Sequence, residues 1–341
     1  LLWLEFLGDS QIWHQESGSL HLAYREDELS VLQDFAKHSQ SVGYECELLD
    51  ATETEKRTPA VNAQSLLGAL WSPTEVGVNP RQVIHEMPNW LADRFGVEFH
   101  FGVAVTHADR WAVSSAGGTS WRADRVIIAA GADFRFLFPD LYREAGFTLC
   151  KLQMMRTVPQ PDNWKLGPMI ASGLTLRHYE SFTICKTLQA LKQRIADETP
   201  ELDDFGIHVM AAQNEQGELI LGDSHEYGDH ISPYDRRLID DLILRELREI
   251  IDLPTWKIGE HWHGVYAKVP NAAEYFDEVD ENLHVAIASG GCGMTMSFGL
   301  AEAHWEQWLP TPHTSQIANA DARVPIEAEC SLDTTTNDAR N

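Results

Sequence analysis

Apolar residues recur along the chain with two different periods, and stretches of the two kinds alternate. Residues 80–95 carry apolar groups at helical spacing, with Asn79 and Pro80 as a start signal and Gly96 as a stop. Every second residue of 97–105 is apolar, which predicts a half-buried strand. The apolar run 126–130 is unbroken and ends at Gly131, which predicts a parallel strand covered on both faces.

The strands expected in the middle third of the chain carry polar and cationic side chains among the apolar ones. These strands, two of which flank a hairpin turn at 214–217, are 152–158, 174–179, 207–213 and 218–222. A helix is expected to begin at Ser232-Pro233-Tyr234-Asp235 and to end before Pro254. Its apolar stripe consists of Ile239, Leu242, Ile243, Leu247, Ile250 and Ile251. Residues 1–7 are typical of an amphipathic helix already under way at Leu1.

These patterns predict an α/β fold in which two domains interleave along the sequence. A buried α/β sheet is expected from 77–147 and 260–309, and a more antiparallel, partly polar sheet from 11–76 and 148–259. Residues 310–341 have few large apolar groups and no periodicity, so we expect a disordered tail there.

Charge and cysteine usage narrow the class of protein. The 341 residues contain 52 acidic and 26 basic side chains, a formal net charge of −26. Such a surface repels phosphate backbones and anionic membranes, so nucleic acid is not an expected partner. The five cysteines are scattered without a C-x-x-C pair, which favours a reducing, cytoplasmic location. No apolar run approaches the roughly 20 residues of a membrane span.

The stretch 283–297 carries the clearest chemical signal. It consists of an apolar strand, the glycine-rich turn Ser289-Gly290-Gly291-Cys292-Gly293, and the start of a helix. Glycines allow a ligand to approach the backbone, and a helix start offers unpaired N–H groups with partial positive charge. The turn could therefore bind an anion or an electron-rich ring edge, although close packing of helix on strand explains the same glycines.

Three segments together resemble a known family. Residues 125–132 (RVIIAAGA), 262–266 (WHGVY) and the turn at 289–297 resemble, in order and spacing, the FAD-dependent oxidoreductases of the D-amino-acid oxidase, glycine oxidase and sarcosine oxidase superfamily. The resemblance covers residues 1 to about 309. It implies FAD as cofactor and an FAD-binding three-layer domain interleaved with an antiparallel-sheet α+β substrate domain. It also implies that about seventy family positions, with the G-x-G-x-x-G turn for the FAD pyrophosphate, precede Leu1.

One subgroup of that superfamily is more similar still. Residues 151–157 (KLQMMRT), 173–179 (GLTLRHY) and 222–228 (GDSHEYG) resemble oxidoreductases associated with aminophosphonate breakdown. The resemblance implies oxidation of the C–N bond of a small anionic amine by hydride transfer to flavin N5, with hydrolysis of the imine. Oxygen or an electron-transfer partner would reoxidise the flavin. Two alternatives stay open: a glycine-, sarcosine- or D-amino-acid-type carboxylate substrate, and an inactive fragment or interaction module that binds no FAD.

The resemblance and the residue chemistry give a set of candidate site residues. The expected cofactor-binding residues are Val105, Ala130, Gly131, Gly290, Gly291, Gly293, Met294 and Thr295. Cations suit an oxyanion, so the expected substrate-binding residues are Arg156, Arg177, His178 and His225. His263 and Tyr266 are the candidate catalytic residues, placed to orient the amine near the flavin.

Plainer roles compete with several of these assignments. Arg156 and Arg177 would serve equally as partners of the many carboxylates, and Cys292 suits a packed thiol better than a covalent flavin link. The histidines 208, 225, 261 and 263 raise the question of a metal site. No nearby carboxylate or cysteine completes a ligand set in the sequence, so no metal site is predicted.

Overall fold

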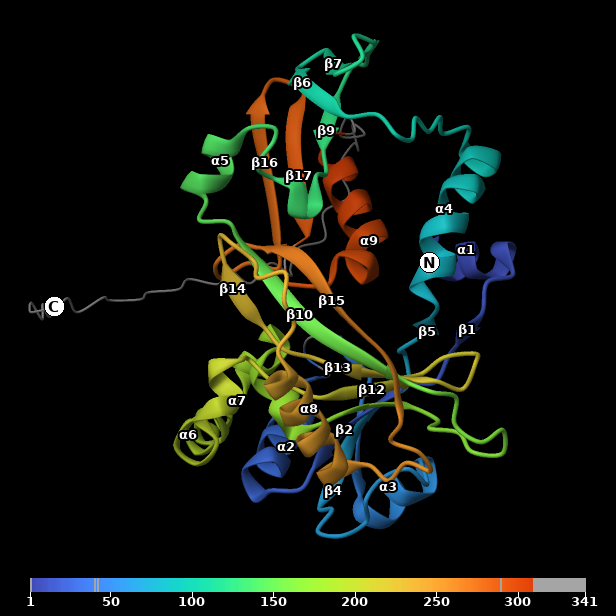
Figure 1. Ribbon diagram of the computed structural model, residues 1–341, viewed down its shortest axis with the longest axis vertical. Helices are drawn as coiled ribbons and strands as arrows, with labels where there is room; N and C mark the ends of the chain where they lie inside the picture. Colours follow the sequence, from blue (N-terminus) through green and yellow to red (C-terminus); the bar gives the residue numbers. More distant parts are fainter. Residues whose placement is uncertain (1, 40, 42, 289, 309–341) are drawn as a thin grey trace, which may run out of the picture. The chain divides into compact units, whose positions relative to one another are not determined.

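The computed structural model describes residues 2–39, 41, 43–288 and 290–308 (Figure 1). The chain divides into two compact units, Leu1–Phe298 and Gly299–Asn341, and every sheet lies in the first unit. The expected tail 310–341 lies outside the described residues. The mixed α/β class expected from the sequence is confirmed by the several sheets and their covering helices.

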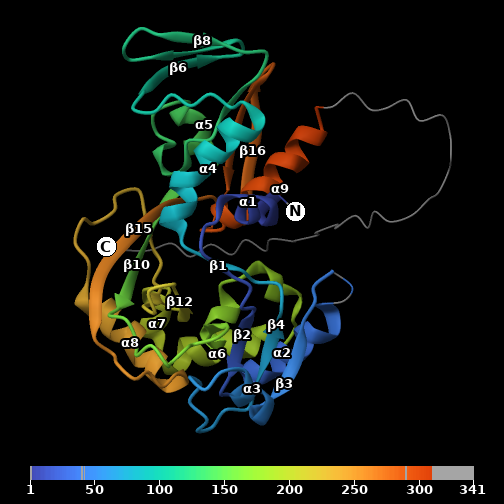
Figure 2. The same ribbon diagram turned by 90° about the vertical axis from the view of Figure 1, so that its right-hand side faces the viewer.

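The largest sheet has nine strands and dominates the first unit. Its order is β14-β10-β13-β12-β11-β2-β4-β3, and β15 lies along the other side of β10. The strands are β2 (Ser19–Ala23), β3 (Glu47–Asp50), β4 (Gly68–Ser72), β10 (Thr148–Thr157), β11 (Met169–Ala171), β12 (Met210–Gln213), β13 (Leu219–Gly222), β14 (Glu226–Gly228) and β15 (Ile258–Lys268). Only β11 and β2 pair in parallel. Strands β10 and β15 run side by side over their whole length (Figure 2).

Three smaller sheets complete the β-structure. One has the order β16-β17-β9, in which β17 pairs antiparallel with β16 and parallel with β9. A second is the antiparallel β6-β7-β8 sheet, and the third is the pair β1-β5. Their strands are β1 (His14–Gln15), β5 (Gly77–Val78), β6 (Val105–Asp109), β7 (Ala112–Ser115), β8 (Ser120–Arg122), β9 (Val126–Ile128), β16 (Glu274–Asp280) and β17 (Leu283–Ala288).

The helices connect and cover these sheets. They are α1 (Leu2–Ser10), α2 (Glu26–Ser39), α3 (Ala51–Arg57), α4 (Pro80–Phe95), α5 (Pro139–Glu144), α6 (Leu188–Glu198), α7 (Pro200–Asp204), α8 (Arg237–Ile250) and α9 (Gly293–Glu306), with short 3₁₀ helices η2 (Gly131–Asp133), η3 (Gly173–Arg177) and η4 (Glu180–Ile184). The predicted signals of α4 are confirmed: the Asn79 side chain accepts from the Arg81 N–H at 3.1 Å, and Gly96 ends the helix with φ +70°.

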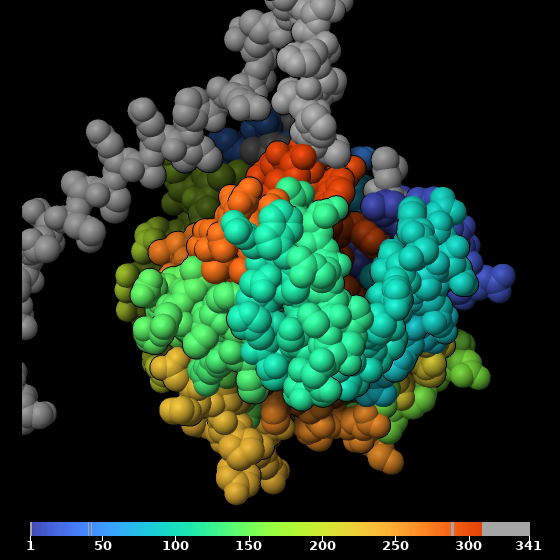
Figure 3. Space-filling model, turned by 90° about the horizontal axis from the view of Figure 1, so that it is seen from above, coloured from blue at the N-terminus to red at the C-terminus, as the bar shows by residue number. Residues whose placement is uncertain are grey.

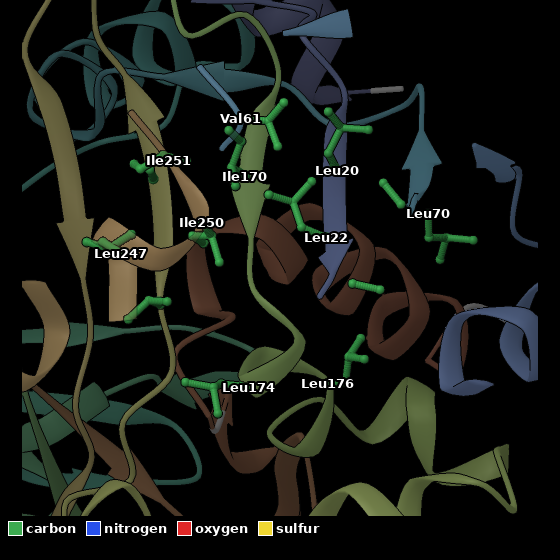
Figure 4. Packing of buried hydrophobic residues seen from close by; sticks show 14 of the residues in the cluster. Leu20, Leu22, Val61, Leu70, Ile170, Leu174, Leu176, Leu247, Ile250 and Ile251 are labelled. Carbon is green, nitrogen blue, oxygen red and sulfur yellow. The ribbon is translucent and has the colours of Figure 1, made fainter. Parts of the chain in front are cut away.

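One face of the nine-stranded sheet forms the main core. Cross-strand register aligns Met155, Leu221, Ala211, Ile170 and Leu20 in a single buried row. The stripe of α8, with helices α2 and α6, packs in the same cluster, as Figure 4 shows for part of it. The prediction of that stripe is confirmed, because its six members are all buried. The opposite face of the sheet carries Met154, Gly222, Met210 and His21, and it borders cavities instead of helices.

The expected strand over 97–105 is wrong. Among the described residues no strand pairs with 97–104, and only Val105 enters β6. The alternating apolar side chains therefore stay at the surface, where Phe101 is 75% exposed and its ring stacks on Phe99. Alternation marks a strand only where a neighbouring strand supplies hydrogen bonds. Figure 3 shows the face formed by α4 (cyan) and the β6-β7-β8 sheet (turquoise), with a hollow between them.

Three further expectations need correction. Residues 174–177 belong to η3 and His178 is its C-cap, so the strand expected over 174–179 is wrong. The helix expected from Ser232 starts at Arg237 instead. Strand β9 is parallel as predicted, in its pairing with β17, but Ile127 is 45% exposed, so the expectation that both faces of this strand are covered is wrong for the described residues.

Candidate functional site

The glycine-rich turn follows the parallel pair β9–β17. Ile128 is paired with Val285, so the turn at Ala130–Gly131 and the turn after Ala288 leave the same edge of the sheet. Gly290 and Gly291 adopt φ +78° and +77°, a region that side-chain-bearing residues rarely occupy. Helix α9 begins directly afterwards at Gly293. Ser289, where the predicted turn begins, lies outside the described residues.

A cavity of about 240 Å³ lies beside this turn. Segments far apart in the sequence meet there: β10, the stretch between η3 and η4, β12 with its approach, the β13–β14 connection, β15, the β15–β16 connection and the glycine-rich turn. The lining residues are Leu152, His178, Tyr179, Glu180, His208, Met210, Asp223, His225, Tyr266, Lys268, Ala273, Gly290, Gly291 and Cys292. The nine-stranded sheet thus contributes its uncovered face to a polar cavity closed on one side by the glycine-rich turn.

Two tyrosines line the cavity. Burial, with a smaller contribution from the Asp223 carboxylate, raises the pKa of Tyr179 to about 12. Burial also raises the pKa of Tyr266 well above its usual value, reinforced by Cys150. Both phenols therefore keep their protons across the neutral range and can donate hydrogen bonds to a bound anion.

Lys268 is the one lysine or arginine among the lining residues. It stands two positions after Tyr266 on β15, and the period of a strand places both side chains on one face. A Cβ at Gly290 would lie 3.5 Å from its Nζ, so the ammonium group lies against the turn. No ion pair joins Lys268 to a carboxylate in the part of the chain that the structure describes.

A second, largely apolar cavity of about 370 Å³ adjoins the first on the same sheet face. Tyr179 and Met210 line both cavities, and the Tyr179 hydroxyl lies 3.5 Å from the Met210 Sδ. His21 also borders the apolar cavity, and burial lowers its pKa to about 4. The ring is therefore neutral at physiological pH.

The two candidate catalytic residues lie on opposite faces of β15. Tyr266 lines the polar cavity, whereas His263 points to the α8 side, where its Nδ1 is 2.8 Å from the Asp235 carboxylate. His261 shares that second face and pairs with Asp240 at 3.0 Å. The strand period alone separates His263 from Tyr266, because residues three positions apart on a strand lie on opposite faces. The register of β15 against β10 is needed only to show which of the two faces borders the cavity.

The two candidate substrate arginines are engaged elsewhere. Arg156 pairs with Glu218 at 2.8 Å and Glu260 at 2.7 Å. Arg177 pairs with Asp203 and donates to the Ile207 carbonyl at 2.6 Å. Neither lines the polar cavity, in contrast to His178 and His225, which both do.

The candidate cofactor residues fall into two groups. Gly290 and Gly291 line the cavity, and Gly293, Met294 and Thr295 form the first turn of the helix that follows. Ala130 and Gly131 lie at the neighbouring strand end, whereas Val105 begins β6 and does not line the cavity. Sequence reasoning missed Lys268, Tyr179 and Asp223. The strand period after Tyr266 could have found Lys268.

Comparison with known proteins identifies the family. The profile of the DAO family, described as FAD dependent oxidoreductase, matches residues 1–304. The chain belongs to this family. It is therefore an FAD-dependent oxidoreductase, as the sequence resemblance implied, and its cofactor is FAD. A search of the curated proteins gives no match.

Solved structures share the fold of this oxidoreductase at low sequence identity. L-proline dehydrogenase from P. horikoshii is 16% identical with a TM-score of 0.68, and the match covers 91% of this chain and 78% of that one. Glycine oxidase from Bacillus cereus is 15% identical with a TM-score of 0.64, over 87% and 73% of the two chains. L-alpha-glycerophosphate oxidase from Mycoplasma pneumoniae, solved with FAD bound, is 15% identical with a TM-score of 0.67, over 90% and 77%.

The residues of the oxidoreductase fit the flavin ring system of FAD. The glycines of the turn have no side chains, so a ligand in the cavity can approach their backbone. A Cβ on Gly291 would lie 3.7 Å from the Tyr266 ring and would fill part of the space between the turn and β15. The first turn of α9 follows with its free N–H groups. When bound, FAD supplies two-electron oxidation of the substrate. The 341 residues contain no G-x-G-x-x-G motif for its pyrophosphate. No helix in the described ranges is long and apolar enough to cross a membrane.

Proposed function

We propose that this oxidoreductase oxidises the C–N bond of a small amine that carries an anionic group. The Lys268 ammonium carries the proposal, since it lies in the cavity beside the glycine-rich turn without an ion pair among the described residues. Buried cations elsewhere in this acidic chain have carboxylate partners, as Lys151 has Asp235 and Arg177 has Asp203. An ammonium group that lines a cavity and has no ion pair of its own favours an anion from outside the chain.

The other lining residues can complete the binding of such a substrate. The Tyr266 and Tyr179 phenols donate hydrogen bonds to the anionic group beside Lys268. The Nδ1 of His225 lies 3.0 Å from the Gly206 carbonyl, which fixes the proton there and leaves the lone pair on Nε2. Burial lowers the pKa of His225, so the ring stays neutral near pH 7.

An aminophosphonate is the first substrate class for this site. Three segments resemble the aminophosphonate-associated subgroup, and each contributes a residue to the lining of the cavity. Leu152 comes from 151–157, His178 from 173–179 and His225 from 222–228. These three segments are far apart in the sequence. Their convergence on one cavity supports a shared substrate class.

A carboxylate substrate is the second class, and a different observation favours it. A phosphonate carries more charge than a carboxylate and is best held by several cations, whereas a carboxylate needs one. Lys268 is the single permanent cation among the lining residues. Glycine- or amino-acid-type amines therefore fit the charge of the cavity at least as well.

Bleaching of bound FAD under nitrogen tests the proposal and separates the two classes. The FAD-loaded protein is mixed with aminophosphonates, with amino acids and with neutral amines of the same size. Faster bleaching by either anionic series than by neutral amines supports the proposal, and the faster series identifies the class. Bleaching by neutral amines alone would contradict it, and failure to bind FAD would favour the inactive-fragment alternative.

A charge-removing substitution tests the role of Lys268. In Lys268→Met, the rate constant kcat/KM for anionic amines should fall about 10- to 100-fold, the value of a charge-assisted hydrogen bond. The rate with neutral amines should change little. Lys257→Met is the matched control, because Lys257 is exposed and does not line the cavity. Equal losses for neutral and anionic amines would refute the assignment.

A further inference from the structure

Three histidines from separate segments meet at the polar cavity. His178 follows η3, His208 precedes β12, and His225 lies between β13 and β14. One ring nitrogen from each lies within 4.8 Å of the others. The ring centroids are 4.5 Å apart for His178 and His208, 5.0 Å for His208 and His225, and 5.3 Å for His178 and His225.

The cluster contains buried polar atoms that lack partners. The Nε2 of His178 and the Nδ1 of His208 are buried without a hydrogen bond to any described residue. His208 is only 3% exposed. Buried polar atoms are nearly always satisfied in folded proteins, so two unsatisfied ring nitrogens in one cluster indicate a missing ligand.

The other ring nitrogens are already engaged in the way that metal-bound histidines require. The Nδ1 of His225 lies 3.0 Å from the Gly206 carbonyl, and the Nε2 of His208 lies 2.9 Å from the Asp223 carboxylate. The His178 ring hydrogen-bonds the backbone of Ile207. Such outer partners hold the proton on one nitrogen and leave a lone pair on the other.

The backbone fixes these rings in place. His208 and Asp223 exchange both backbone hydrogen bonds, at 3.2 and 2.8 Å, and the His225 N–H donates to the Phe205 carbonyl at 2.8 Å. Gly206 has φ +53°, and a Cβ there would lie 2.8 Å from that of His225. Backbone hydrogen bonds and close packing therefore fix the positions of His208 and His225.

The chemistry of the three side chains selects the class of ion. Imidazole nitrogens are ligands for zinc and its neighbours among the divalent transition metals.

We propose that His178, His208 and His225 bind a divalent transition-metal ion, with Zn²⁺ as the best match, and that Asp223 orients His208 toward it. Three nitrogen ligands leave a fourth position, which faces the cavity shared with Tyr179 and Lys268. The site reverses the sequence-based expectation of no metal. That expectation grouped His208 and His225 with His261 and His263, and the fold places the latter two on the far face of β15.

Equilibrium dialysis of the purified full chain against Zn²⁺ tests the site, and the readout requires no substrate. One Zn²⁺ per chain is expected, and Co²⁺ in its place should give the visible absorption of a nitrogen-liganded ion. His208→Ala and His225→Ala should abolish Zn²⁺ binding, and Asp223→Asn should weaken the affinity for Zn²⁺ about 10- to 100-fold. His261→Ala and His263→Ala are the matched controls and should retain it.

The outcomes are distinguishable from misfolding and from failure of the proposed function. Near-ultraviolet circular dichroism confirms that each variant is folded, and His178→Gln offers a milder change should His208→Ala unfold. Absence of Zn²⁺ and Co²⁺ binding by the folded wild-type chain would overturn the proposal. Binding that survives both His208→Ala and His225→Ala would overturn it too. Flavin bleaching by amines reports separately on the oxidoreductase activity.

Discussion

Lys151 is a cation buried to 1% exposure in a chain with a net charge of −26. Its Nζ donates to the carbonyls of Ser232 at 3.1 Å and Tyr234 at 2.6 Å, and it lies 2.8 Å from the Asp235 carboxylate. Asp235 in turn contacts His263. A single side chain of β10 therefore anchors the segment before α8.

Removing this cation should destabilise the protein. Lys151→Met leaves Asp235 and two carbonyls without their partner, and we expect a loss of about 3 kcal/mol in the free energy of unfolding. Urea unfolding with a tryptophan fluorescence readout measures it. Lys257→Met, at an exposed position, should change stability by less than about 0.5 kcal/mol. A similar loss in both variants would show that the buried contacts carry no special weight.

The same pair gives a pH dependence with a defined sign. Burial raises the pKa of Asp235, but the hydrogen bond and charge of Lys151 outweigh it and hold the pKa below its usual value. A lowered pKa in the folded state adds stability above the unfolded value, which is lost as pH falls through the folded value. The stability difference between wild type and Lys151→Met should therefore shrink in acid, below about pH 4.

Individual residue roles were the least accessible from the sequence. Arg156 and Arg177 were plausible anion ligands by residue type, but each has carboxylate partners that only the fold brings near. His178 and His225 do reach the cavity. A side chain's partner depends on cross-strand register and on segments far away in the chain, and neither is encoded in local spacing.

Helix α8 shows what periodicity predicts well at the scale of an element. Its apolar stripe was evident in the sequence, because burial of one helix face requires that spacing. The first residue of α8 was not evident. The segment 232–235 has the residue types of a helix start, but Lys151 of β10 binds its carbonyls and the Asp235 carboxylate and holds it as a loop. A helix start signal is local in the sequence, whereas this contact comes from a distant strand.

Truncation on the buried side of α8 should be costly. Leu247 is fully buried in the main core, so Leu247→Ala should lower the free energy of unfolding by about 2–5 kcal/mol. Leu238 lies on the same helix with 55% exposure, and Leu238→Ala should cost less than about 0.5 kcal/mol. The shift in urea midpoint at constant slope measures both. Equal shifts would mean that α8 does not pack as described.

The charge of the whole molecule sets its response to salt. Carboxylates outnumber cations two to one, and like charges repel over roughly 10 Å at 0.1 M salt but only about 3 Å at 1 M. The melting temperature should therefore rise by about 2 °C or more between 0.01 and 1 M NaCl. Sucrose at equal osmolality is the control for non-ionic effects. A fall in melting temperature with NaCl would show that screened ion pairs outweigh repulsion.

At this scale the sequence predicted the fold class, a parallel strand at 126–130 and a glycine-rich turn between the last strand and the last helix. These features are marked by unbroken apolar runs and by glycines that the backbone needs. It failed over 97–104, where an alternating pattern finds no neighbouring strand among the described residues. The histidine cluster was missed because three segments that are far apart in the sequence must meet before it is visible.

The partition between the two cavities consists of a phenol and a thioether. Met210 has an unbranched side chain that changes rotamer at little cost, and the Tyr179 hydroxyl reaches it through a weak sulfur contact. A change in these two side chains would open the polar chamber into the apolar one without moving the backbone. The rotamers of Tyr179 and Met210 would then set the upper limit on substrate length. Amines with a hydrophobic extension could bind with their anionic group at Lys268 and the extension in the apolar cavity.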